Sequence, residues 1–208
     1  MEDKETGRLE AFSDGVFAVA ITLLVLDIKI PTDIKSSSAL LNDLWEQRWT
    51  FSAFIVSFFF VGIMWMNHHR LFTHIRRTNT GLMLLNLLLL FFIVLTPVPT
   101  ALLAEHWDLA SPNPAAIVYG GTFFLMACCF NFLWFYASYH NRLLGKDVDK
   151  QAVAVISRRF LFGPISYLIA LGLAFINAPA SLIFQFILAL FYALPGQVIP
   201  DRRQPPKQ

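Results

Sequence analysis

The sequence predicts an all-α membrane protein with six transmembrane helices. Its 208 residues are 56% hydrophobic and only 14% charged, whereas soluble domains carry about 25% charged residues. The mean hydropathy is +0.57. Apolar stretches recur along the chain, and about 20 apolar residues are needed to cross a hydrocarbon core of roughly 30 Å. Because short loops separate them, we expect residues 1–208 to form one six-helix transmembrane domain.

Six apolar segments define the expected spans. They are Phe12–Ile28, Phe51–Met66, Leu82–Leu103, Ala115–Tyr139, Phe160–Ile176 and Ala180–Val198. The second segment continues into WMNHHRLF, so one of its ends is polar. Pro97 and Pro99 are expected to bend or end the third span, and Gly163–Pro164 predicts a kink in the fifth. The leader MEDKETGRLEAFSD is mixed in charge, unlike a cleavable signal peptide, so we expect the first span to be retained.

Basic residues are distributed unevenly between the loops. If the spans alternate in direction, the two termini and residues 67–81 and 140–159 share one side of the membrane. That side carries Lys4, Arg8, Arg70, Arg76, Arg77, Arg142, Lys146, Lys150, Arg158, Arg159, Arg202, Arg203 and Lys207. The other side carries Lys29, Lys35 and Arg48. The positive-inside rule then predicts cytoplasmic termini for a multi-pass protein of the cell membrane. The net charge of +2 follows from this topology and indicates no nucleic-acid partner.

The first span differs from the other five in its charged ends. Its uncharged core, Gly15–Leu26, is twelve residues long. At 1.5 Å per residue this core measures about 18 Å, which is too short to cross lipid alone. Asp14 and Asp27 would each cost at least about 2.5 kcal/mol in hydrocarbon if unpaired. We therefore expect other helices or water to surround this span.

A helical wheel places a largely apolar row along one side of the first span. Phe12, Gly15, Val19, Thr22 and Leu26 lie within about 40° of Arg8, with Leu23 about 60° away. Ser13 and Asp14 point more than about 100° from this row. Periodicity leaves two interpretations open. The row is either ordinary packing between helices or the lining of a narrow pore on an oligomer axis, closed by hydrophobic constrictions.

The start of this span resembles a known signature. RLEAFSDG carries Arg-x-x-x-Phe-Ser-Asp on Arg8, Phe12, Ser13 and Asp14, and resembles the transmembrane-protein-175 family of endosomal and lysosomal potassium channels and their prokaryotic relatives. FAVAITLLVLDIKIP and MWMNHHRLF resemble the family as well. Animal members carry two six-helix repeats, whereas a single repeat resembles the prokaryotic form. The resemblance implies a homotetramer whose first helices line the pore, and the sequence has no TVGYG-like potassium filter.

The resemblance also implies roles for residues of the apolar row. The family's pore constrictions fall five, nine and twelve positions after the motif aspartate, at Val19, Leu23 and Leu26. The residue linked to potassium preference falls eight positions after it, at Thr22. The first constriction is usually Ile or Leu, and Val19 is smaller. We expect a potassium-preferring leak channel that needs no cofactor, with K⁺ as the permeant partner and a proton leak as in some relatives.

Polar residues crowd the inner end of the second span at Asn67, His68, His69 and Arg70. A metal site is not predicted, because adjacent histidines point apart and no third ligand has a recognisable spacing. Two interpretations remain: hydrogen bonding to Asp14 or Ser13, which the family's use of its motif implies, or a solvated helix end.

Polar residues elsewhere allow weaker inferences. Asp27, Asp33, Asp43 and Glu46 either concentrate cations at a pore mouth or belong to a solvated loop. Asn86 and Asn131 are expected to form hydrogen bonds between helices.

Other functional classes find less support in the sequence. No Ser/His/Asp spacing, Gly-rich phosphate loop or paired metal motif indicates an enzyme. A cation- or proton-coupled secondary transporter is the main alternative, and it would require a broken helix and a site near the middle of the membrane. A membrane scaffold without transport is the third interpretation.

Overall fold

The computed structural model describes residues 6–32, 36–145 and 150–193, and these ranges are helical with short connections. The elements are α1 (Gly7–Leu23), η1 (Leu24–Asp27), α2 (Ser37–Glu46), α3 (Arg48–His74), α4 (Thr80–Leu95), α5 (Pro97–Glu105), α6 (Pro114–Ser138), η2 (Tyr139–Asn141), α7 (Lys150–Ala174) and α8 (Ala178–Ala193). An isolated backbone bridge joins Ile75 and Leu144, and no strand forms within the described ranges. The all-α class is thus confirmed.

In the part of the chain that the structure describes, five helical stretches are long and apolar enough to cross a membrane. They are Gly7–Asp27, Arg48–His74, Thr80–Glu105, Pro114–Asn141 and Val153–Ala174. The expected sixth span corresponds to α8, an apolar helix of 16 described residues. Residues 194–198 of that expected span lie outside the described part of the chain.

Two helices extend well beyond the apolar segments that predicted them. Helix α3 continues for two further turns past Met66, and α7 begins ten residues before Phe160. These extensions are polar in sequence yet carry buried side chains, among them His68, Phe72 and Ile156. Hydropathy identifies the part of a helix that is apolar enough for lipid. It does not identify polar helix ends that pack inside the protein.

The third expected span is divided at Thr96. Helix α4 ends at Leu95, and α5 begins at Pro97, which occupies the first position of the new helix. A proline fits there because its missing N–H would have no partner within the helix in any case. The sequence predicts a bend or an end of the span at Pro97, and the structure shows that one helix ends before it and another starts at it. The two pieces together make one candidate span.

Pro164 has a different consequence, because α7 runs through it without a break in the helix assignment. A proline inside a helix leaves the carbonyl four residues earlier without its N–H donor. That carbonyl belongs to Phe160, and the side-chain amide of Asn131 on α6 donates a hydrogen bond to it. Asn131 thus joins two helices, as expected, and it does so at the position that Pro164 leaves unpaired.

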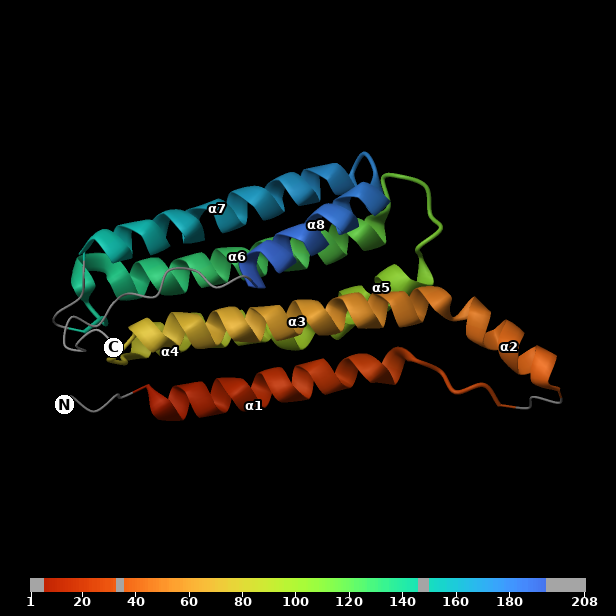
Figure 1. Ribbon diagram of the computed structural model, residues 1–208, viewed down its shortest axis with the longest axis horizontal. Helices are drawn as coiled ribbons and strands as arrows, with labels where there is room; N and C mark the ends of the chain where they lie inside the picture. Colours follow the sequence, from red (N-terminus) through yellow and green to blue (C-terminus); the bar gives the residue numbers. More distant parts are fainter. Residues whose placement is uncertain (1–5, 33–35, 146–149, 194–208) are drawn as a thin grey trace, which may run out of the picture.

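Helix α2 has no counterpart among the expected spans. Ser36 caps it, because its hydroxyl accepts a hydrogen bond from the backbone N–H of Ala39 at 3.2 Å. None of its residues is buried, although Leu41 and Trp45 are apolar. It extends beyond the right-hand end of α1 and α3 in Figure 1.

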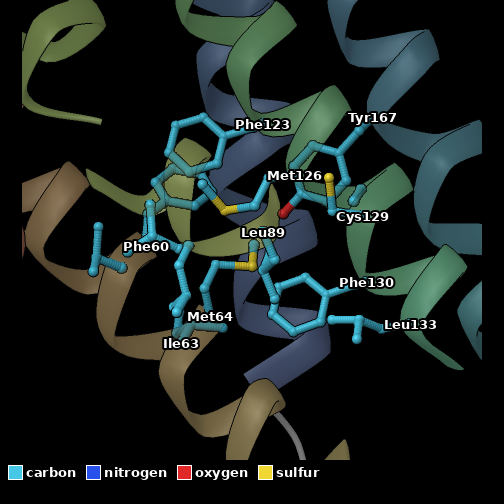
Figure 2. Close-up of a cluster of buried hydrophobic side chains, with 14 of the residues drawn as sticks. Phe60, Ile63, Met64, Leu89, Phe123, Met126, Cys129, Phe130, Leu133 and Tyr167 are labelled. Atoms are coloured by element: carbon cyan, nitrogen blue, oxygen red, sulfur yellow. The ribbon is translucent and has the colours of Figure 1, made fainter. Parts of the chain in front are cut away.

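The helices form a bundle with α6 at its centre and α1 at its edge. Helices α6, α7 and α8 lie side by side, α3 with α4 and α5 come next, and α1 packs against α3 and α4 (Figure 1). In the most apolar stretch of each span, 61% of the residues are buried in the span that contains α6, and 22% are buried in the span that contains α1. Figure 2 shows the core between α3, α4, α6 and α7, where Phe60, Met64, Phe123 and Met126 meet.

Candidate pore helix and its anchoring network

Helix α1 buries one face against its own chain. Ser13, Phe17 and Ala20 of α1, and Leu24 at the start of η1, recur at helical spacing and are almost completely buried. Their neighbours are α3 and α4, which lie on one side of α1 (Figure 1). This face fixes how α1 is rotated about its axis.

The opposite face of α1 carries the apolar row that the sequence singled out. The exposed fraction is 57% for Val19, 37% for Leu23 and 72% for Leu26. Phe12, at the start of the row, is exposed as well. No described element of the chain covers these side chains, so the row faces outward from the subunit, toward lipid, water or a further copy of the chain.

Thr22 is the single hydroxyl-bearing residue on this face, and it is exposed. Its Oγ1 lies 2.8 Å from the carbonyl oxygen of Val19 and 3.1 Å from that of Ala18. A hydroxyl has one hydrogen and two lone pairs. Because the hydrogen is directed at the helix backbone, the lone pairs are free to face a cation or water.

A buried chain of hydrogen bonds anchors the first half of α1. Nδ2 of Asn86, on α4, donates to Oγ of Ser13 at 2.9 Å. The Ser13 hydroxyl in turn donates to the carbonyl oxygen of Leu9 at 2.8 Å, so it must accept from Asn86. Oδ1 of Asn86 lies 2.9 Å from Nε2 of His68 on α3. Since an amide oxygen only accepts, Nε2 of His68 carries the proton.

The two aromatic neighbours of His68 complete this anchor. Its imidazole stacks on Phe72, with ring centroids 4.5 Å apart, and meets Phe17 of α1 at 5.4 Å. The buried face of α1 is thus held by a polar chain and an aromatic contact that share one histidine.

A second hydrogen bond ties α1 to α3 at the surface of the subunit. Nε1 of Trp65 donates to Oδ1 of Asp14 at 2.8 Å. The Trp65 ring also stacks on His69, with centroids 6.1 Å apart. The acid therefore has a neutral indole donor as its partner.

Some predicted site residues lie apart from these contacts. Arg8 is exposed, and Asn67 is half-buried. Arg70 reaches the other side of the bundle, where its guanidinium donates to the carbonyl oxygens of Tyr192 at 3.2 Å and Ala193 at 2.7 Å. These carbonyls close the last described turn of α8, where a cation is electrostatically favoured. Within the described ranges, no cluster of three or more His, Cys, Asp or Glu side chains could hold a metal ion.

The sequence predicts that Asn86 joins helices, but it does not predict that Asn86 is the partner of Ser13. It also gives no role to Trp65, the partner of Asp14. Asn86 is the one amide in the apolar stretch of α4, which was a usable signal. Trp65 lies three residues before His68 on α3, so the two share a helix face. Nothing in the sequence identified which of the surrounding aromatic residues would reach Asp14.

Known proteins are similar to this region in sequence. Residues 8–97 match the family described as endosomal/lysosomal potassium channel TMEM175. The matched range holds α1, the network and the start of α5. It covers less than half of the chain, and whole-chain similarity comes from individual relatives.

A potassium channel of Chamaesiphon minutus is 44% identical over 194 residues, which is 93% of this chain and 96% of that protein. The crystal structure of a Chamaesiphon minutus homologue of the lysosomal potassium-selective channel TMEM175 superposes with a TM-score of 0.80 at 42% identity, over 91% of this chain and 96% of that one. The endosomal/lysosomal proton channel TMEM175 of Bos taurus is 45% identical over 93 residues, or 41% of this chain and 19% of that protein.

Proposed function

The chain belongs to the TMEM175 family, and from this membership we propose that it is a potassium-preferring cation channel of the multi-pass membrane proteins. The full-length relative from Chamaesiphon minutus is named a potassium channel, and the Bos taurus relative a proton channel. We include protons as a second permeant ion on that basis. The same relatives support a function in transport without an enzymatic step.

The pore in this proposal is built from α1 of four copies of the chain around one axis. One observation carries it: the face of α1 that the family resemblance assigns to the pore is uncovered in the subunit, whereas the opposite face is packed. Val19, Leu23 and Leu26 would then form three apolar rings. Such rings hold back hydrated cations until they widen and fill with water.

Thr22 lies between Val19 of the first ring and Leu23 of the second, and we propose that it favours potassium there. Its hydroxyl hydrogen is occupied by the backbone, so four such residues would present oxygen lone pairs toward the axis. The permeation path needs no cofactor. Conduction is passive and follows the electrochemical gradient.

The motif residues act in this proposal by fixing α1 to its own subunit. Ser13 and Asp14 connect α1 to α4 and α3 through Asn86 and Trp65. His68 lies behind them, and His69 flanks Trp65. Arg8 and Phe12 are exposed at the start of α1 and are proposed to contact a neighbouring copy. Asn67 belongs to the same end of α3, and the structure gives no role for it.

We further propose six spans with α8 as the last, in one domain with both termini in the cytoplasm of a cell-membrane protein. Labelling with a membrane-impermeant maleimide tests this. Ala110→Cys, between α5 and α6, should react from outside, and Tyr139→Cys, at the end of α6, only after the membrane is opened. Reaction of both from the same side would refute the topology.

Reconstitution into liposomes with a potassium-flux assay tests the function. We expect flux that is driven by voltage and saturates poorly, and we expect Leu23→Ala and Leu26→Ala to increase it by widening the rings. A flux that saturates and requires a coupled ion would indicate the secondary transporter. No flux at any voltage would leave the scaffold interpretation.

A further inference from the structure

Two loops meet at the end of the bundle where α3 and α6 finish, at the left of Figure 1. Residues 75–79 leave α3, and residues 139–145 follow α6. The carbonyl oxygen of Leu143 accepts hydrogen bonds from the backbone N–H groups of Arg76 at 2.9 Å and Arg77 at 3.2 Å. These two bonds join the loops, so that Arg76 and Arg77 lie on a segment bonded directly beside Arg142, more than sixty residues away in the chain.

Arg77 is the innermost of the three. It is half-buried, and its Nη2 donates to the carbonyl oxygen of Leu144 at 3.3 Å. Its Nε is fully buried and has no hydrogen-bond acceptor among the described residues. A guanidinium offers five donors and no acceptor. An unpaired buried donor on a permanent cation is costly, so a negative charge held near the guanidinium would stabilise Arg77 even without a direct hydrogen bond to Nε.

Arg142 is held in place by a rigid aromatic support. Its guanidinium carbon lies 5.2 Å from the centre of the Tyr136 ring. The Tyr136 hydroxyl donates to Oδ1 of Asn79 at 3.3 Å, and a side chain at Gly81 would collide with that hydroxyl. The Tyr136 ring therefore occupies space that only a glycine leaves open. Arg142, whose guanidinium lies over this ring, is exposed, and Arg76 on the joined loop is exposed as well.

The described parts of the two loops contain no acidic residue to neutralise these arginines. Asp147 and Asp149 follow in the sequence and lie outside the described residues. Lys146 and Lys150 stand in the same stretch, so it adds no net negative charge. The surface is therefore positive and lies at the ends of membrane-crossing helices.

We propose that Arg76, Arg77 and Arg142 form a binding site for the phosphate headgroup of an anionic phospholipid. Planar guanidinium groups bind phosphate oxygens in pairs, and basic sites at the ends of membrane helices are suited to lipid headgroups. A lipid is favoured over free phosphate because Phe135, in the last turn of α6, and Tyr139, directly after it, expose apolar surface at the same end of the bundle. Uneven charge between loops would explain the number of arginines, but it does not require the two loops that carry them to be joined through Leu143.

The test uses the full chain in a neutral detergent and does not depend on channel activity. Lipid binding is measured by native mass spectrometry during titration with dioleoyl phosphatidylglycerol, dioleoyl phosphatidylcholine or inorganic phosphate. We expect phosphatidylglycerol to bind more tightly than phosphatidylcholine. Each of Arg76→Gln, Arg77→Gln and Arg142→Gln should weaken its binding about fivefold.

Arg48→Gln is the matched control at the opposite end of the bundle. Arg48 also lies over aromatic rings, at 5.3 Å from Trp45 and 5.2 Å from Trp49, and its removal should leave binding unchanged. If Arg77→Gln does not fold, the exposed Arg76→Gln and Arg142→Gln variants carry the test. Equal binding of the two lipids, unchanged affinity in the arginine variants or an equal loss in Arg48→Gln would overturn the proposal. Competition by inorganic phosphate at the same concentration as the lipid would overturn the lipid as the ligand.

Discussion

The two faces of α1 do not divide into a polar and an apolar face, as those of a soluble amphipathic helix do. The packed face combines Ser13 and Ala20 with the large apolar Phe17 and Leu24, and it is anchored by a polar chain through Asn86. The uncovered face holds Val19, Leu23 and Leu26. Lipid is as apolar as leucine, so packing between membrane helices depends on close fit and hydrogen bonds more than on hydrophobicity. The comparison teaches that an exposed leucine row needs no special explanation by itself.

The exposed row of α1 can also be compared with the exposed side chains of α4. Helix α4 also exposes apolar side chains. The exposed fraction of Leu84 is 61%, which is similar to the 72% of Leu26. Exposure alone therefore cannot separate a pore from a lipid contact. The two rows differ in that the α1 row includes Thr22, a hydroxyl, and continues into the family motif.

The largest stability effect is expected on the packed face of α1. Leu24→Ala should lower the free energy of unfolding by about 2–4 kcal/mol, because it leaves a cavity between α1 and the rest of the bundle. Leu26→Ala is the matched control and should change it by less than about 0.5 kcal/mol. Unfolding in detergent, followed by circular dichroism, measures both. Similar losses in the two variants would mean that the faces of α1 are not distinct.

The next effect concerns the polar chain behind α1. Asn86→Leu should cost about 1–3 kcal/mol of unfolding free energy, because Ser13 and His68 both lose a buried partner. Ser13→Ala in the Asn86→Leu background should then cost much less than Ser13→Ala alone, since the two residues share one hydrogen bond. Additive losses would indicate that the chain does not act as a unit.

A smaller effect is expected at the exposed hydrogen bond between α1 and α3. Trp65→Phe keeps the ring next to His69 but removes the donor to Asp14, and should cost about 0.5–1.5 kcal/mol. Asp14→Asn retains an acceptor oxygen and should cost less. A larger loss in Asp14→Asn than in Trp65→Phe would show that the charge of Asp14 has a partner other than the indole.

The smallest stability effect is expected at Thr22, where the change should appear in selectivity. Thr22→Val replaces an exposed hydroxyl with a methyl group of similar size and should alter unfolding by less than about 0.5 kcal/mol. The ratio of potassium to sodium flux in liposomes should fall. An unchanged ratio would remove Thr22 from the proposed permeation path.

Composition and hydropathy predicted the helical membrane class, because long apolar stretches leave few other folds. The row on α1 also followed from sequence, since helical periodicity fixes which residues share a face. Helix α2 did not follow, because the expected elements were membrane spans and its ten residues are too few to cross a membrane. The partners Trp65 and Asn86 depend on how α3 and α4 are rotated against α1, and one sequence does not contain that rotation.

Whether the row of α1 meets water or lipid is the central question, and cysteine accessibility answers it most directly. Leu26→Cys and Leu84→Cys are compared in a background with Cys128→Ala and Cys129→Ala, in liposomes, with a charged methanethiosulfonate reagent. The pore proposal predicts that the reagent modifies Leu26→Cys and reduces its potassium flux, while Leu84→Cys stays unmodified in lipid. If Leu26→Cys is as unreactive as Leu84→Cys while potassium still flows, α1 faces lipid and the pore lies elsewhere.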